Sequence, residues 1–195
     1  MEGAPLRYSM RSYFSAFSGD PSTELDEDIS ALMGDATRLQ QDMSVHPVLL
    51  AADMRNLLAE AERLLGQVGE QPEGCPADPT FMRIITQVIA DVMNTFLNKW
   101  NGEEADALQM IALRHMVEVG LRAGVLGVGA PDAAVGSFLQ VKAEKVLQRQ
   151  FDAVAAQDPM SLNDLSQIAV TATLLGYTFD TGVSGSDICL ALGSC

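Results

Sequence analysis

The sequence has few aromatic and few basic residues. Phe, Trp and Tyr make up only 6% of its 195 residues, whereas 48% are hydrophobic, so the core must be mainly aliphatic. Ala, Leu and Met favour helix packing over a β-sandwich. The 12 Lys and Arg residues face 26 Asp and Glu residues, which gives a formal net charge of −14. Because nucleic acids and anionic membrane surfaces are bound through clustered cations, this composition argues against both partners.

Cysteines and long apolar runs are also scarce. The three cysteines, Cys75, Cys189 and Cys195, show no C-x-x-C spacing, so we expect neither a disulfide framework nor a structural zinc site. Every apolar stretch is interrupted by charge or Gln within two turns, which predicts no membrane span. The N-terminal residues lack the basic start and apolar run of a signal peptide. We therefore expect a reduced, cytoplasmic protein.

Signatures of catalysis are missing as well. The glycines of residues 124–136 match neither G-x-x-x-x-G-K-[ST] nor a strand followed by G-x-G-x-x-G. The serines lie in turns, Cys189 has no histidine near it in the sequence, and no Glu-x-x-His motif is present. The sequence predicts that the protein is not an enzyme.

Apolar residues recur at spacings of three and four along most of the chain, as in amphipathic helices. We expect about six helices and no sheet, over approximately residues 22–45, 47–68, 80–100, 103–124, 132–156 and 162–179. In the fifth helix the expected core positions are Val135, Phe138, Leu139, Val146 and Val154. The predicted organisation is an N-terminal extension (1–21), one all-α domain (22–179) and a flexible C-terminal tail (180–195).

One histidine stands within an apolar helical pattern, in the stretch "LQMIALRHMVEVGLRAG". Leu108, Ile111, Ala112, His115 and Val119 share one face of this helix, so the imidazole should lie on the buried side. A lone histidine in that position is most often a core residue with one satisfied nitrogen. The competing interpretation is an axial ligand to haem, because a porphyrin supplies four nitrogens and needs only one imidazole.

The order of the helices around this histidine resembles the globin superfamily. "VMNTFLNKWNGEEADALQMIALRHMVEVG" is similar to a distal and a proximal helix, and "VGSFLQVKAEKVL" and "DPMSLNDLSQIAVTATLLGYTF" to the two helices that follow. The resemblance covers about residues 80–179. It implies a single globin-like domain in which His115 is the proximal iron ligand. The residues that it implies to line the haem are Ile85, Ile89, Ile111, Phe138 and Leu139.

The resemblance implies a role in binding or sensing a diatomic gas. Ile85 would take the distal position, where it offers no hydrogen bond to bound oxygen, so CO, NO or a five-coordinate ferrous state would be favoured. The alternative is a cofactor-free helical protein of globin-like or bundle fold. Its apolar excess and ten methionines would then form a homo-oligomer interface or bind a partner helix.

Overall fold

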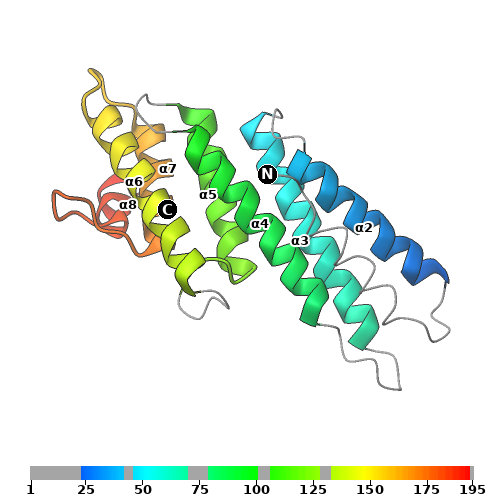
Figure 1. Ribbon diagram of the computed structural model, residues 1–195. Helices are drawn as coiled ribbons and strands as arrows, with labels where there is room; N and C mark the ends of the chain where they lie inside the picture. Colours follow the sequence, from blue (N-terminus) through cyan, green and yellow to red (C-terminus); the bar gives the residue numbers. More distant parts are fainter. Residues whose placement is uncertain (1–22, 42–45, 70–78, 101–105, 128–132, 194–195) are drawn as a thin grey trace.

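The computed structural model describes residues 23–41, 46–69, 79–100, 106–127 and 133–193. Within these ranges the chain forms seven α-helices and no β-strand (Figure 1). The helices are α2 (Thr23–Gln41), α3 (Pro47–Gly69), α4 (Pro79–Lys99), α5 (Ala107–Arg122), α6 (Ala133–Ala155), α7 (Leu162–Leu175) and α8 (Gly185–Leu192). The all-α prediction is confirmed, with one helix more than the sequence analysis expected. The predicted extension of residues 1–21 lies outside the described residues.

The helices follow one another across an elongated molecule. Figure 1 shows α2 and α3 at one end, α4 and α5 in the middle, and α6, α7 and α8 at the other end. α3 packs against α2 and α5, whereas α7 packs against α5, α6 and α8. α4 contacts α2, α3, α5 and α6, so it connects the two ends. A single aliphatic cluster therefore extends through the whole described structure.

The two helices with the clearest apolar pattern are buried as the pattern predicts. The α3 stripe of Leu50, Met54, Leu57, Leu58, Ala61 and Leu64 is buried. α4 is buried on a wider arc, by Ile84, Ile85, Val88, Ile89, Val92, Met93, Phe96 and Leu97, because neighbours cover it from several sides. None of the helices in the described ranges is long and apolar enough to cross a membrane.

The C-terminal segment from residue 180 was expected to be a flexible tail, and that expectation is wrong for α8. Ser184 begins the helix as a capping box, in which Asp187 N donates to Ser184 Oγ (3.2 Å) and Ser184 N donates to Asp187 Oδ2 (2.9 Å). Hydrogen bonds from the Ser184 side chain and backbone lower the pKa of Asp187. Gly193 ends the helix at φ 64°, a left-handed conformation that glycine adopts without strain.

α8 reaches α7 by close backbone contact at Gly185. A Cβ atom at this position would lie 2.4 Å from the carbonyl oxygen of Ala169 and 2.7 Å from the amide nitrogen of Thr173. Only glycine allows the first turn of α8 to approach α7 this closely, and Ile188 is then buried between them and the core. α7 itself ends at Leu175, four residues before the predicted end, because Gly176 takes φ 66°.

Cys189 on α8 is disulfide-bonded. The sequence analysis expected reduced cysteines because their spacing suggested neither a disulfide framework nor a zinc site. That expectation is wrong for Cys189, since spacing along the chain does not show which cysteines the fold brings together.

Candidate functional site

His115 lies on α5 in a polar cluster at the boundary with α7. Its side chain is 27% exposed, and its Nδ1 is 3.3 Å from Glu118 Oε2. Arg114 Nε donates to Glu118 Oε1 (3.0 Å), and Arg114 Nη1 donates to Gln167 Oε1 of α7 (3.2 Å). The cluster thus joins His115 to a carboxylate and fastens α5 to α7.

The carboxyl group of Glu118 is the electrostatic centre of this cluster. Partial burial raises its pKa, but hydrogen bonds from Arg114 and His115 outweigh burial, and the pKa of Glu118 lies below its ordinary value. Glu118 is therefore held as a carboxylate by two neighbours on its own helix.

The sequence predicts that His115 lies on the buried side of α5, and the structure places it at the edge of that side, partly buried. The buried residues of α5 are Met110, Ala112, Leu113, Met116, Val117, Val119 and Gly120, whereas Leu108 is 51% exposed. Leu108 lies at the exposed start of the helix, where Asp106 caps it and accepts hydrogen bonds from the backbone of Leu108 and Gln109. His115 therefore stands at the edge of the core.

The residues implied to line a haem have different surroundings. Ile85 and Ile89 have no accessible surface, so protein atoms enclose them and leave no open space beside them. Leu139 is buried, Ile111 is partly buried, and Phe138 is 53% exposed. A haem between α4 and α5 would need a cavity at Ile85 and Ile89, and these residues do not provide one. Haem binding stays a prediction of the resemblance alone.

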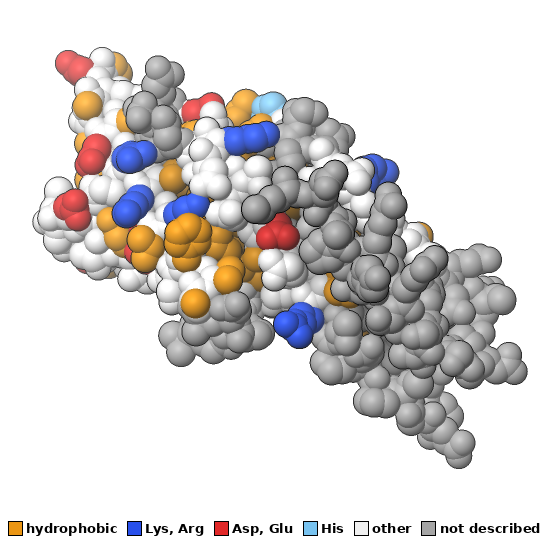
Figure 2. Space-filling view, in the orientation of Figure 1, with side chains coloured by type: hydrophobic (Ala, Val, Ile, Leu, Met, Phe, Trp, Pro, Cys, Tyr) orange, Lys and Arg blue, Asp and Glu red, His pale blue; other side chains and the backbone are white. Residues whose placement is uncertain are grey.

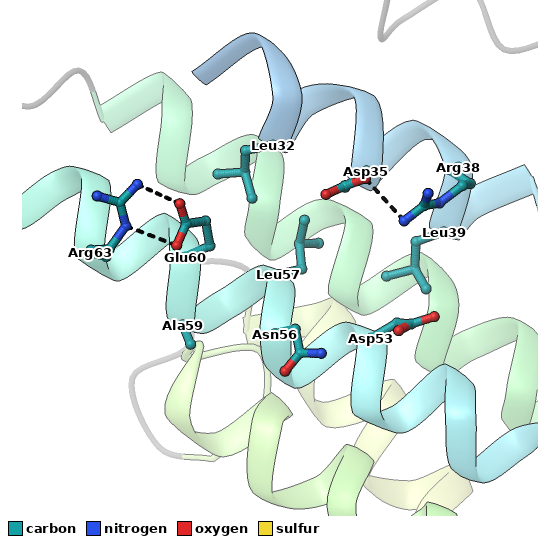
Figure 3. Close-up of a pocket in the computed structure, with 10 residues that line it drawn as sticks. All are labelled: Leu32, Asp35, Arg38, Leu39, Asp53, Asn56, Leu57, Ala59, Glu60 and Arg63. Atoms are coloured by element: carbon teal, nitrogen blue, oxygen red, sulfur yellow. Dashed lines mark hydrogen bonds and ion pairs between the residues drawn. The ribbon is translucent and has the colours of Figure 1, made fainter. Parts of the chain in front are cut away.

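A cavity of about 590 Å³ lies elsewhere, between α2 and α3, and we call it the α2–α3 hollow (Figure 3). None of the six predicted haem residues lines it. Its lining residues are Leu32, Asp35, Arg38, Leu39, Asp53, Asn56, Leu57, Ala59, Glu60 and Arg63. The leucines form an apolar floor, and the charged side chains stand around them (Figure 3).

Most charges around the α2–α3 hollow are neutralised by one another. Arg38 Nη2 lies 3.0 Å from Asp35 Oδ1, and Arg63 binds both Glu60 and Asp28. The hydrogen bond from Arg63 lowers the pKa of Glu60. In the part of the chain that the structure describes, no group of three or more His, Cys, Asp or Glu side chains could hold a metal ion. The hollow therefore offers ion pairs and no reactive group.

A third region, on α6, exposes three apolar side chains, two of which, Val135 and Phe138, are predicted core positions. Val135, Phe138 and Val141 are 37%, 53% and 47% exposed and follow one another at spacings of three. The buried face of α6 is formed instead by Leu139, Ala143, Val146, Leu147, Gln150 and Val154. The prediction is confirmed for Leu139, Val146 and Val154 and is wrong for Val135 and Phe138, because α4 and α7 cover only one of two apolar stripes.

Lysines stand directly beside this exposed stripe. Lys142 Nζ lies 4.3 Å from the centroid of the Phe138 ring, and it donates to Asn94 Oδ1 (2.9 Å) and to Asn98 Oδ1, both on α4. Lys145 is exposed one turn further along α6. Figure 2 shows hydrophobic side chains gathered over the first half of α6, beside a row of basic ones. We call Val135, Phe138, Val141, Lys142 and Lys145 the α6 surface.

The lysines of the α6 surface differ from four arginines of the described structure in their partners. Arg38, Arg63, Arg114 and Arg122 each form an ion pair with a carboxylate. Among the described residues, neither Lys142 nor Lys145 has a carboxylate within ion-pair distance. In a chain with 26 acidic residues, the α6 surface thus combines exposed apolar side chains with cations that lack an acidic partner.

Comparison with known proteins adds no relative for this chain. Neither a family model nor a curated protein nor a solved structure matches it. The function must therefore be argued from the arrangement of its own residues.

Proposed function

We propose that this protein is a cofactor-free helical interaction protein that binds another macromolecule through the α6 surface. The observation that supports the proposal is the row of Val135, Phe138 and Val141, three large apolar side chains exposed on one side of a helix. Single exposed apolar residues are common on soluble proteins, but neighbouring ones framed by polar residues mark interaction sites. Here lysines frame the row.

The apolar row contributes enough free energy for a weak contact. Full burial of a Val or Phe side chain contributes about 1.5–3 kcal/mol. Since each of the three side chains is about half exposed, covering all of them contributes roughly 2–4 kcal/mol. Association costs at least about 4 kcal/mol in lost translational and rotational freedom, so polar contacts must supply the remainder.

The globin-like haem protein, with His115 as iron ligand and a diatomic gas as ligand, is the competing proposal. One measurement separates the two. We expect freshly purified protein to be colourless and to show no Soret band when haemin is added. A Soret band that His115→Ala abolishes would overturn the proposal of a cofactor-free protein and support haem binding.

The interaction itself can be tested by photo-crosslinking. p-Benzoylphenylalanine replaces Phe138, an aromatic residue of similar shape, and in a matched control it replaces Arg55, an exposed residue on α3. After irradiation in the cells that naturally make the chain, we expect one discrete adduct from position 138 and none from position 55. The adduct should disappear when Val141→Ser is added. Equal labelling at both positions, or none at position 138, would refute the proposed interaction.

A further inference from the structure

We propose that the partner of the α6 surface is an acidic amphipathic helix of a different protein. Its apolar residues cover Phe138 and Val141, and its carboxylates pair with Lys142 and Lys145. This inference rests on the proposed function and specifies the chemistry of the partner.

Charge is the first argument for an acidic partner. The chain carries a net charge of −14, yet neither lysine of the α6 surface has a carboxylate within ion-pair distance among the described residues. Lys142 instead contacts two amide oxygens and an aromatic ring, and these groups do not neutralise it. Lys145 adds a second, exposed cation one turn away. An approaching carboxylate therefore meets an electrostatically complementary site.

Geometry is the argument for a helical partner. Residues 135, 138, 141, 142 and 145 occupy one side of three turns of α6, a length of about 15 Å at 1.5 Å per residue. A second helix laid along this row presents side chains at spacings of three and four, which match it. The contacts of Lys142 with α4 and with Phe138 hold both side chains in place before binding, and this lowers the entropy cost of ordering them.

Other occupants fit the α6 surface less well. Nucleic acid and anionic membranes bind through many neutralised phosphates, whereas the α6 surface offers only two lysines. A second copy would have to offer an acidic helix with a free apolar face. The strongly acidic helix α2 turns its apolar residues inward, since Ile29, Leu32, Met33, Ala36 and Leu39 are all buried. A different protein therefore matches the surface better.

Two synthetic peptides test the charge of the partner. Both are 18-residue helices with the same leucine stripe, and glutamates flank the stripe in one whereas lysines flank it in the other. Binding to the full chain is measured by fluorescence anisotropy. We expect the glutamate peptide to bind about tenfold more tightly than the lysine peptide, and the difference to shrink at high salt.

Matched variants locate the binding site. Lys145→Glu should weaken binding of the glutamate peptide about tenfold, and Phe138→Ser should weaken both peptides. Arg55→Glu makes the same charge change at an exposed position of α3 and should leave binding unchanged. Circular dichroism confirms that each variant keeps its helices. Equal affinity for the two peptides, or equal losses in Lys145→Glu and Arg55→Glu, would overturn the inference.

The outcomes separate this inference from the proposed function. If position 138 crosslinks to a protein while the glutamate peptide fails to bind, the interaction surface stands and the acidic helix is wrong. A crosslink to a second copy or to nucleic acid would likewise contradict the acidic helix alone. If position 138 gives no adduct and neither peptide binds, both proposals fail.

Discussion

The α2–α3 hollow and the α6 surface combine the same kinds of side chain in opposite ways. In the hollow, leucines form a recessed floor, and Arg38 and Arg63 are paired with carboxylates of the same chain. On α6, apolar side chains protrude, and neither the partly buried Lys142 nor the exposed Lys145 has an acidic partner among the described residues. Most charges of the hollow are already paired, whereas the α6 surface gains both apolar and ionic contacts when something covers it.

The largest expected effect is a difference in the free energy of unfolding between variants of two adjacent residues of α6. Leu139 is 1% exposed and Phe138 is 53% exposed. Leu139→Ala should lower the free energy of unfolding by about 2–5 kcal/mol, because it leaves a cavity in the core. Phe138→Ala should cost less than about 1 kcal/mol, mainly the lost contact with Lys142. Urea denaturation of both variants measures the difference, and equal losses would show that Phe138 belongs to the core.

A second comparison opposes two glycines at the two ends of the molecule. Gly185→Ala places a Cβ against the backbone of α7 and should destabilise the protein by about 1–3 kcal/mol. Gly66 is exposed on α3, and no atom lies within 4 Å of a Cβ added there. Gly66→Ala should therefore stabilise the protein by about 0.4–1 kcal/mol. Thermal unfolding shows whether each substitution raises or lowers the stability of the protein.

Hydrogen exchange shows which helices lose stability in Gly185→Ala. We expect faster exchange in α8 and unchanged exchange in α2 and α3, because α8 packs on α7 at the far end. A Gly185→Ala protein as stable as the original, with α8 still protected, would contradict the described close approach.

The strongest sequence patterns predicted the fold best. α3 and α4 each have an apolar pattern that only one packing arrangement can bury, and both are buried as expected. α6 was harder because it carries two apolar stripes on different sides, and only the neighbouring helices decide which one is covered. Val135-x-x-Phe138-x-x-Val141 was a readable signal of a second stripe. Val135 and Phe138 were assigned to the core because no pattern along one helix reveals where its neighbours lie.

The remaining differences have local causes. α8 has only eight residues, too few for a clear periodicity, although Ser184 and Asp187 already form a capping-box pattern in the sequence. His115 was assigned to the buried face because Leu108 was counted as apolar core. The start of α5 is in fact exposed. His115 contacts Glu118, Glu118 accepts a hydrogen bond from Arg114, and Arg114 donates to a residue of α7.

The third prediction tests whether paired and unpaired cations behave differently. Arg63→Gln removes the partner of Glu60 and Asp28 and should lower the midpoint of thermal unfolding slightly at low salt. The difference should vanish in 1 M NaCl, because salt screens exposed charges. Lys145→Gln should leave the midpoint unchanged or raise it, since it removes a cation without an acidic partner in the described structure. If Lys145→Gln destabilises as much as Arg63→Gln, the contrast between the two regions is wrong.

The smallest expected effect concerns Glu118, a paired carboxylate at the boundary between α5 and α7. Its pKa lies below the ordinary value of 4.5 because hydrogen bonds from Arg114 and His115 outweigh partial burial. The unfolded chain lacks these partners, so the ionised group stabilises the fold fully above pH 4.5, and this stability is lost as the pH falls through the folded pKa. An NMR titration should give a midpoint for Glu118 below 4.5. Arg114→Gln should raise this midpoint, whereas Arg122→Gln, which removes the partner of Glu62, should not. If the titration midpoint of Glu118 is the same in Arg114→Gln, then Arg114 is not its ionic partner, and this carboxylate resembles the lysines of the α6 surface.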